Sequence, residues 1–150
     1  MTIVIDSGVL LKAYFPDEEG HIEAQSLIGD YARGNITFHA PTLITYEIIN
    51  ACLVASRMAR FPKEKVKELM YEMLGIEIFK EDIEPLKDRV FAISAKHSRN
   101  AYDGAYIAVA ESKHLPFLTG DKRLFESLKT HFPFVKWIGN YPEVKKQFSR

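Results

Sequence analysis

Short apolar runs alternate along this chain with longer segments of helical spacing, and this alternation restricts the fold more than any other feature. Thr2 to Ile5 is a β-branched run that stops at Asp6, and the segment from Gly8 to Phe15 has helical spacing and ends at Pro16. Strands and helices continue to alternate along the chain. Further strands are expected over 36–39, 76–79, 116–119 and 134–138, and further helices over 21–31, 42–60, 63–74, 83–96, 100–113 and 122–130, with a short helix after Pro142. Short apolar strands that alternate with helices are typical of a parallel sheet buried on both faces. The sequence therefore predicts an α/β fold of three layers, with a mainly parallel sheet flanked by helices.

The length and composition of the chain narrow the class of protein. Its 150 residues contain no internal repeat and no linker-like stretch, so a single domain is expected over 1–150. The single cysteine, Cys52, excludes a disulfide framework and suits a reducing compartment. No apolar run approaches the length of a membrane span, so a cytoplasmic protein with no membrane partner is expected. The 20 basic and 20 acidic residues balance, which means that charge alone identifies no partner.

Two acidic residues come directly after predicted strands. Asp6 follows the first strand, and Asp121 follows the run Phe117-Leu118-Thr119-Gly120. Ligand sites of open parallel sheets lie outside the carboxyl ends of the strands, which favours a functional role for both residues. Each could instead cap the helix that follows it, since Asp accepts hydrogen bonds from the first amides of a helix. Neither residue decides between these two interpretations by itself.

Two further acidic residues stand in helical segments that are otherwise apolar. Glu47 is surrounded on its helix face by Leu43, Ile44, Ala51 and Val54. A helix of this composition is expected to be mostly buried, and a metal ion or a salt bridge would then offset the cost of burying the carboxylate. Asp103 stands among small residues, where the alternative role is a favourable contact with the helix dipole.

Taken together, the four acidic residues favour a site for a hard divalent cation. Mg²⁺ and Mn²⁺ bind carboxylate oxygens and substrate phosphates, and a cluster of three or four acids is the usual protein contribution. The five histidines form no HExxH motif, which makes a zinc hydrolase a poor match. The sequence also lacks a Walker loop, a GxGxxG loop and a G-x-S-x-G nucleophile elbow.

These residues and their surroundings resemble the PIN-domain nucleases, in particular the small VapC-type toxins of toxin-antitoxin pairs. The resemblance covers most of the chain and is carried by Ile3-Val4-Ile5-Asp6-Ser7, Pro41-Thr42-Leu43 with Tyr46-Glu47, Tyr102-Asp103-Gly104-Ala105-Tyr106, and Leu118-Thr119-Gly120-Asp121. It implies a parallel sheet flanked by helices and a metal-dependent endonuclease that cleaves RNA. It also implies that the metal site is formed by Asp6, Glu47, Asp103 and Asp121. A homodimer and an antitoxin that covers the active cleft are further implications.

The resemblance has one departure, at Gly8. The family often has a hydroxyl or amide residue two positions after the first Asp, and here Gly8 occupies that position. Ser7 and Thr119 are therefore the candidates for supporting the site. Contacts to the RNA backbone are expected from Lys12, Arg99, Lys122 and Arg123, with Tyr14 or Tyr102 as stacking faces.

The expected mechanism uses a water activated by Mg²⁺ or Mn²⁺ that Asp6, Asp103 and Glu47 hold, with a second ion near Asp121. Two alternatives share the fold, namely a housekeeping nuclease for RNA processing and a noncatalytic module that binds RNA or protein. A phosphatase of the haloacid dehalogenase type would need an acid at position 8, where Gly8 stands.

Overall fold

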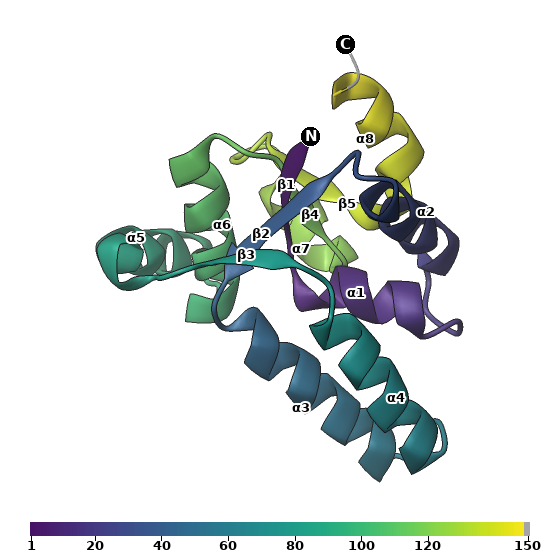
Figure 1. Cartoon of the computed structure of the whole chain (residues 1–150). Coiled ribbons are helices and arrows are strands. Elements are labelled where there is room, and N and C mark those ends of the chain that lie inside the picture. The colour runs from purple at the N-terminus through teal and green to yellow at the C-terminus, as the bar shows by residue number, and fades with distance from the viewer. Residues whose placement is uncertain (149–150) are drawn as a thin grey trace.

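Five parallel strands form one sheet in the computed structural model, which describes residues 1–148 (Figure 1). The order across the sheet is β3-β2-β1-β4-β5, and each neighbouring pair runs parallel. The strands are β1 (Thr2–Ile5), β2 (Thr37–Pro41), β3 (Ile78–Glu81), β4 (Phe117–Thr119) and β5 (Val135–Trp137). The central strands are buried on both faces, because β1 and β4 are apolar at nearly every position.

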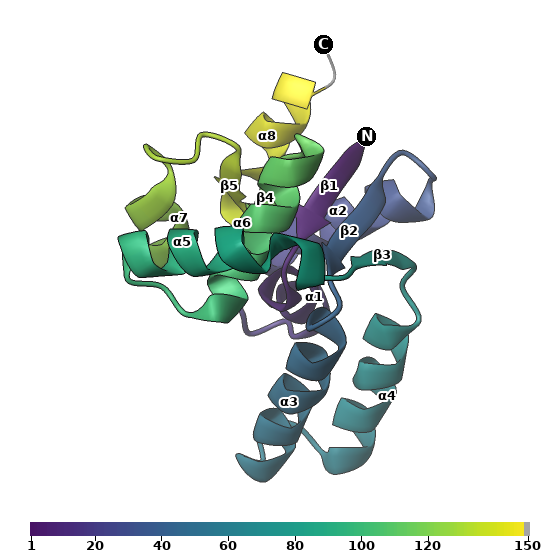
Figure 2. The same ribbon diagram turned by 90° about the vertical axis from the view of Figure 1, so that its left-hand side faces the viewer.

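Helices cover both faces of the sheet. They are α1 (Ser7–Tyr14), α2 (His21–Ala32), α3 (Ile44–Arg57), α4 (Lys63–Leu74), α5 (Lys87–His97), α6 (Ala101–Lys113), α7 (Lys122–Leu128) and α8 (Tyr141–Phe148), with the 3₁₀ turns η1 (Glu84–Leu86) and η2 (Ile138–Asn140). Helices α5 and α6 lie on one side, and α1, α2 and α8 lie on the other (Figures 1 and 2). The predicted three-layer α/β fold is thus confirmed. The expected single domain runs to residue 150, and its last two residues lie outside the described range.

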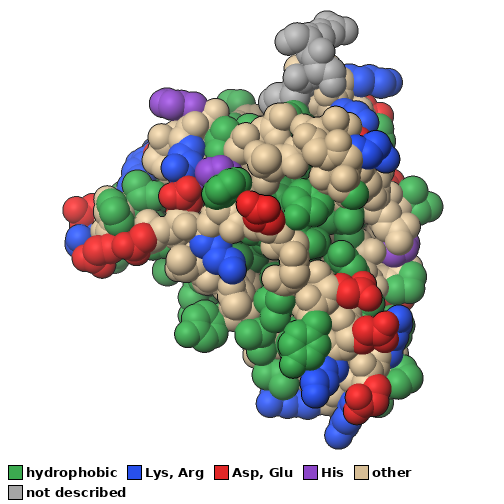
Figure 3. Space-filling model, viewed as in Figure 1, with side chains coloured by type: hydrophobic (Ala, Val, Ile, Leu, Met, Phe, Trp, Pro, Cys, Tyr) green, Lys and Arg blue, Asp and Glu red, His purple; other side chains and the backbone are tan. Residues whose placement is uncertain are grey.

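Helices α3 and α4 form a hairpin that projects away from the sheet (Figure 2). The expectation that the helix around Glu47 is mostly buried is wrong, because α3 packs on α4 with one face only. Tyr46 is 79% exposed, and Leu53 and Val54 are also exposed. Figure 3 shows apolar side chains gathered over this part of the molecule. None of the helices within residues 1–148 has the length and hydropathy that a membrane span requires.

Several boundaries differ from the predicted ones for local reasons. Helix α3 ends at Arg57 rather than at residue 60, because Ala59 adopts a left-handed conformation with a φ of 50°. Strand β2 continues to Pro41, two residues beyond the end expected at residue 39. The helix expected from residue 83 starts as the turn η1, which contains Pro85, before α5 begins at Lys87.

Candidate metal centre and active site

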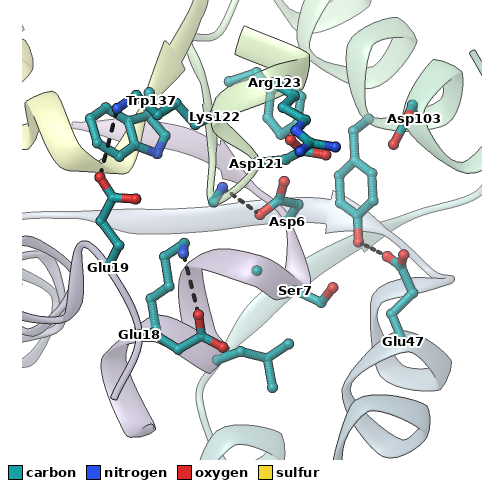
Figure 4. Close-up of a pocket in the computed structure, with 16 residues that line it drawn as sticks. Asp6, Ser7, Glu18, Glu19, Glu47, Asp103, Asp121, Lys122, Arg123 and Trp137 are labelled. Carbon is teal, nitrogen blue, oxygen red and sulfur yellow. Dashed lines mark hydrogen bonds and ion pairs between the residues drawn. The ribbon is translucent and has the colours of Figure 1, made fainter. Parts of the chain in front are cut away.

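A pocket of about 480 Å³ opens at the carboxyl ends of β1, β4 and β5, and all four predicted acidic residues line it (Figure 4). They come from four separate places in the chain. Asp6 follows β1, Glu47 lies in the first turn of α3, Asp103 lies in the first turn of α6, and Asp121 follows β4. Segments far apart in sequence therefore bring their carboxylates to one edge of the sheet, as the strand-end rule predicts for Asp6 and Asp121.

Asp6 is fixed by three donors. Its Oδ1 accepts hydrogen bonds from the backbone N–H of Val9 at 3.1 Å and of Gly120 at 3.0 Å, and its Oδ2 accepts one from the hydroxyl of Thr119 at 2.5 Å. Burial raises the pKa of Asp6 above its usual value despite these donors, and the nearby charge of Asp121 raises it further. The residue caps α1 and faces the pocket at the same time, so the two interpretations of Asp6 are compatible.

The loops after β1 and β4 touch through two glycines. A Cβ atom on Gly120 would lie 2.5 Å from the carbonyl carbon of Gly8, which no real contact tolerates. A Cβ atom on Gly8 would lie 3.2 Å from Oδ1 of Asp6 and 3.3 Å from the Cα atom of Gly120. Position 120 must therefore be a glycine for the start of α1 and the loop after β4 to meet, whereas a Cβ atom at position 8 would make only a tight contact.

Asp121 and Thr119 connect the site to α7. The side chain of Asp121 caps α7 by accepting from the backbone N–H of Leu124 at 3.0 Å. Thr119 is fully buried, and its hydroxyl accepts from the backbone N–H of Asp121 at 2.9 Å while it donates to Asp6. One hydroxyl therefore links the two strand-end acids. Ser7 also lines the pocket.

Glu47 has a tyrosine as its partner, not the lysine or arginine of the alternative interpretation. The hydroxyl of Tyr106 donates to Oε1 of Glu47 at 2.5 Å, and the Tyr106 ring stacks on Phe117 with 5.6 Å between centroids. Burial raises the pKa of Glu47, the Tyr106 hydroxyl partly opposes this, and the charges of Asp6 and Asp103 raise it further. Burial and the facing Glu47 carboxylate likewise raise the pKa of Tyr106, so its proton stays on the phenol.

Asp103 lies at the third position of α6 and pairs with Arg99. The Nε atom of Arg99 donates to Oδ2 of Asp103 at 3.2 Å, and the Asn100 side chain caps the helix through the Asp103 backbone N–H at 2.8 Å. Burial raises the pKa of Asp103, Arg99 opposes the rise, and Asp121 adds to it. Arg99 therefore contacts a site carboxylate, and its predicted role in binding RNA stays a prediction.

The other predicted substrate contacts divide between the pocket and other surfaces. Lys12, Lys122 and Arg123 line the pocket. Tyr14 lies in a separate depression between α1 and α4, away from the acids, and Tyr102 is exposed next to Asp103.

Four further pocket residues were missed by sequence reasoning, namely Glu18, Glu19, Tyr106 and Trp137. Trp137 ends β5, so the strand-end rule applied to the last strand would have found it. Tyr106 shares a helix face with Asp103, which was a usable signal. Glu18 and Glu19 belong to a turn whose location depends on tertiary contacts, so no local pattern indicates them.

The donor set matches a hard divalent cation in its chemistry, since carboxylate oxygens are the ligands that Mg²⁺ and Mn²⁺ prefer. Beyond burial, charges within the cluster also raise the pKa of Asp6, of Glu47 and of Asp103. Within residues 1–148, however, no three acidic, histidine or cysteine side chains converge as metal ligands in their present conformations. For three of these carboxylates to hold one cation together, side chains would have to rotate, as Asp103 would away from Arg99.

The profile of the PIN domain matches residues 3–129, and the chain belongs to this family. Among characterised relatives, ribonuclease VapC3 of Pyrobaculum aerophilum is 28% identical over 131 residues, which are 84% of this chain and 94% of that protein. Ribonuclease VapC12 of Mycobacterium tuberculosis is 26% identical over 125 residues, which are 83% and 91% of the two chains. The predicted resemblance to PIN-domain, VapC-type proteins is thereby confirmed.

Two solved structures share the fold. A crystal structure from Pyrobaculum aerophilum superposes with a TM-score of 0.66 at 19% identity and covers 92% of both chains. A toxin-antitoxin complex from Klebsiella pneumoniae gives a TM-score of 0.53 at 15% identity, with 89% of this chain and 95% of that chain covered. At these identities the two structures support the fold and nothing more specific.

Proposed function

We propose that this protein is a cytoplasmic endoribonuclease that depends on Mg²⁺ or Mn²⁺ and acts as the toxin of a toxin-antitoxin pair. One observation carries the proposal: carboxylates from four separate segments line a single pocket at the edge of the sheet. The chain is a PIN-domain protein similar to two relatives named as ribonucleases, which favours RNA as the substrate. The four acids are Asp6, Glu47, Asp103 and Asp121.

Asp6, Asp103 and Glu47 would hold the catalytic ion, with Asp121 near a second one. The bound metal would lower the pKa of a water molecule that attacks the phosphodiester and would offset the charge of the phosphate. The protein contributes the orientation of its ligands. Thr119 and the backbone N–H of Gly120 fix Asp6, and the Tyr106 hydroxyl holds one oxygen of Glu47.

The cations around the pocket would bind the RNA backbone. Lys12, Lys122 and Arg123 all line it, and phosphate contacts of this kind position a nucleic acid without reading its sequence. The product expected from attack by water carries a 5′ phosphate and a 3′ hydroxyl.

An antitoxin and a second copy of the chain are the proposed protein partners. The exposed apolar side chains of α3, including Tyr46 and Leu53, support a protein contact on the projecting hairpin. A small antitoxin reading frame immediately upstream of the gene is expected for a toxin and not for a housekeeping nuclease.

A cleavage assay tests the enzymatic part of the proposal. Purified protein is incubated with structured and unstructured RNA in the presence of Mg²⁺, Mn²⁺ or a chelator. We expect cleavage with either metal, none with chelator, and a loss of more than about 100-fold in the Asp6→Asn variant, because a metal ligand matters more than the groups that orient it. The His97→Ala variant serves as the control and should stay active. Chelator-resistant cleavage, or loss of activity in folded His97→Ala, would overturn the metal mechanism in favour of histidine acid–base chemistry.

A further inference from the structure

The rim of the pocket carries two carboxylates that the proposed mechanism does not use. Glu18 and Glu19 belong to the turn over 15–20 between α1 and α2, and both line the pocket. The lining therefore contains six carboxylates against three cations, which are Lys12, Lys122 and Arg123. A polyanion that enters such a pocket meets net negative charge, so the two extra acids work against binding an RNA backbone.

The two glutamates face the two lysines that would contact phosphate. The Nζ atom of Lys12 lies 3.6 Å from Oε2 of Glu18, and the Nζ atom of Lys122 lies 3.7 Å from Oε1 of Glu19 (Figure 4). The Lys12 side chain is only 14% exposed, so its charge is directed into the pocket rim rather than into solvent. Each lysine is thus matched by a carboxylate of the same turn.

The turn is held in this position from its outer side by Arg60, in the loop between α3 and α4. The Nε atom of Arg60 donates to Oδ2 of Asp17 at 2.8 Å, and its Nη2 atom donates to Oε1 of Glu18 at 3.0 Å. The guanidinium also lies over the Phe15 ring, 4.9 Å from its centroid. These contacts from a second element fix the acidic turn beside the pocket.

Lys122 has a second partner that would keep it in place without Glu19. Its Nζ atom lies over the indole ring of Trp137, 4.7 Å from the ring centroid. The ring itself covers Gly139, where a Cβ atom would lie 2.2 Å from Trp137. Neutralising Glu19 should therefore leave the ammonium group of Lys122 at the pocket rim and available to an anion.

We propose that Glu18 and Glu19 compete with substrate phosphates for Lys12 and Lys122, so that the turn lowers the affinity of the pocket for an RNA backbone. This inference rests on the proposed ribonuclease function. The phosphates of the RNA have to replace the carboxylates of the turn as partners of the two lysines before the RNA strand lies across the four site acids.

The test compares two double variants with the same change in net charge. Glu18→Gln with Glu19→Gln removes the competing carboxylates. Glu68→Gln with Glu84→Gln is the matched control, since both residues pair with lysines outside the pocket, at 3.7 and 3.0 Å. Affinity for an end-labelled, unstructured RNA is measured by fluorescence anisotropy in chelator at low salt, and kcat/KM is measured with Mg²⁺.

We expect the pocket variant to bind RNA about tenfold more tightly, since each partly exposed ion pair contributes up to about fivefold. The control variant should change the affinity by less than about twofold. Equal gains in both variants, or weaker binding by the pocket variant, would overturn the inference. If the wild-type protein neither binds RNA nor cleaves it with Mg²⁺, the proposed function fails instead.

A second comparison tests the role of the lysine itself. In a Lys122→Gln background, Glu19→Gln should give a clearly smaller gain in affinity than in the wild-type background, because the released cation is absent. An undiminished gain would mean that Glu19 acts by general repulsion, and it would overturn competition for Lys122.

Discussion

Neutralising Asp103 should leave the metal-free protein as stable as the wild type or more stable. Burial raises the pKa of Asp103 above its usual value, even though Arg99 opposes the rise. The native state therefore favours the protonated, neutral carboxyl, and its contribution to stability is present at acid pH and is lost as pH rises through the raised pKa. Asp103→Asn mimics the neutral form, so its advantage should appear at neutral pH and vanish below the usual Asp range.

A structural role of Asp103 would instead make the Asp103→Asn variant less stable, by an amount that can be calculated. If Asp103 were purely structural, Asn would lose the ion pair with Arg99, which precedes the helix and contributes about 0.5 kcal/mol, and the helix-dipole contact, worth about 0.3–1 kcal/mol. A loss of up to about 1.5 kcal/mol would lower the melting temperature by roughly 3–6 °C in a chain of this length. The Asn100 cap survives the substitution, because it bonds to the backbone N–H of residue 103.

A second acid on the same helix provides the control. Arg89 binds Glu111 through two hydrogen bonds of 2.7 and 2.9 Å and holds the pKa of Glu111 below its usual value. That contribution is present above the usual Glu pKa and is lost as pH falls, so Glu111→Gln should destabilise at pH 7 by about 0.2–1 kcal/mol. The two substitutions on α6 therefore have opposite signs at neutral pH and converge on the wild type in acid.

The assay is thermal unfolding at pH 7 in chelator and with Mn²⁺ added. At about 100 times its dissociation constant, a ligand of the native state stabilises it by about 2.7 kcal/mol, and Asp103→Asn should lose most of this gain. Glu111→Gln should retain it. A clear drop in the melting temperature of metal-free Asp103→Asn, together with an unchanged response to Mn²⁺, would show that Asp103 is structural and would refute the reasoning.

Two further predictions concern other side chains. Tyr106→Phe removes the hydroxyl that orients Glu47 and should weaken Mn²⁺ binding, measured by calorimetric titration, by about tenfold or more. Tyr71→Phe, on an exposed face of α4, is the control and should not change the affinity. Equal affinities of the two variants would refute this role of Tyr106. Burial alone would raise the pKa of Asp30, but hydrogen bonds from Tyr141 and two cations outweigh it and hold that pKa well below its usual range. Asp30→Asn should therefore lower the free energy of unfolding by about 2–3 kcal/mol at pH 7, and this difference should shrink in acid. Urea unfolding measures the free energy, and a loss below about 0.5 kcal/mol at pH 7 would contradict the prediction.

The layers of the fold could be predicted because local signals agree with the tertiary structure. Apolar runs that stop at an acid or a glycine became β1 and β4, and the helices after them begin within one residue of the expected places. The end of α3 could not be predicted, since it depends on the left-handed conformation of Ala59 and on Arg60 reaching across to Asp17. The exposed face of α3 could not be predicted either, because the apolar composition of a helix does not show whether a sheet or only a neighbouring helix packs against it.

The candidate site likewise has features that the sequence predicts and features that only the structure shows. Acids at strand ends are visible in a sequence because parallel strands bring their carboxyl ends to one edge, and Asp6 and Asp121 meet there. The caps that these acids form, three residues on, could be expected from the sequence. The contact of Gly8 with Gly120 and the hydrogen bond from Thr119 to Asp6 could not, because they join segments far apart in the chain.

Capping a helix and holding a metal ion were competing explanations for the strand-end acids, and the geometry is compatible with both. A cap holds the carboxylate against the first turn of the helix, and because that helix starts at the sheet edge, the cap also fixes the carboxylate at the mouth of the pocket. Thr119 joins the two caps by donating to Asp6 and accepting from the backbone of Asp121. The helix starts thus position two like charges close together. Burial raises the pKa of Asp6 although three donors surround it, and the nearby charge of Asp121 raises it further.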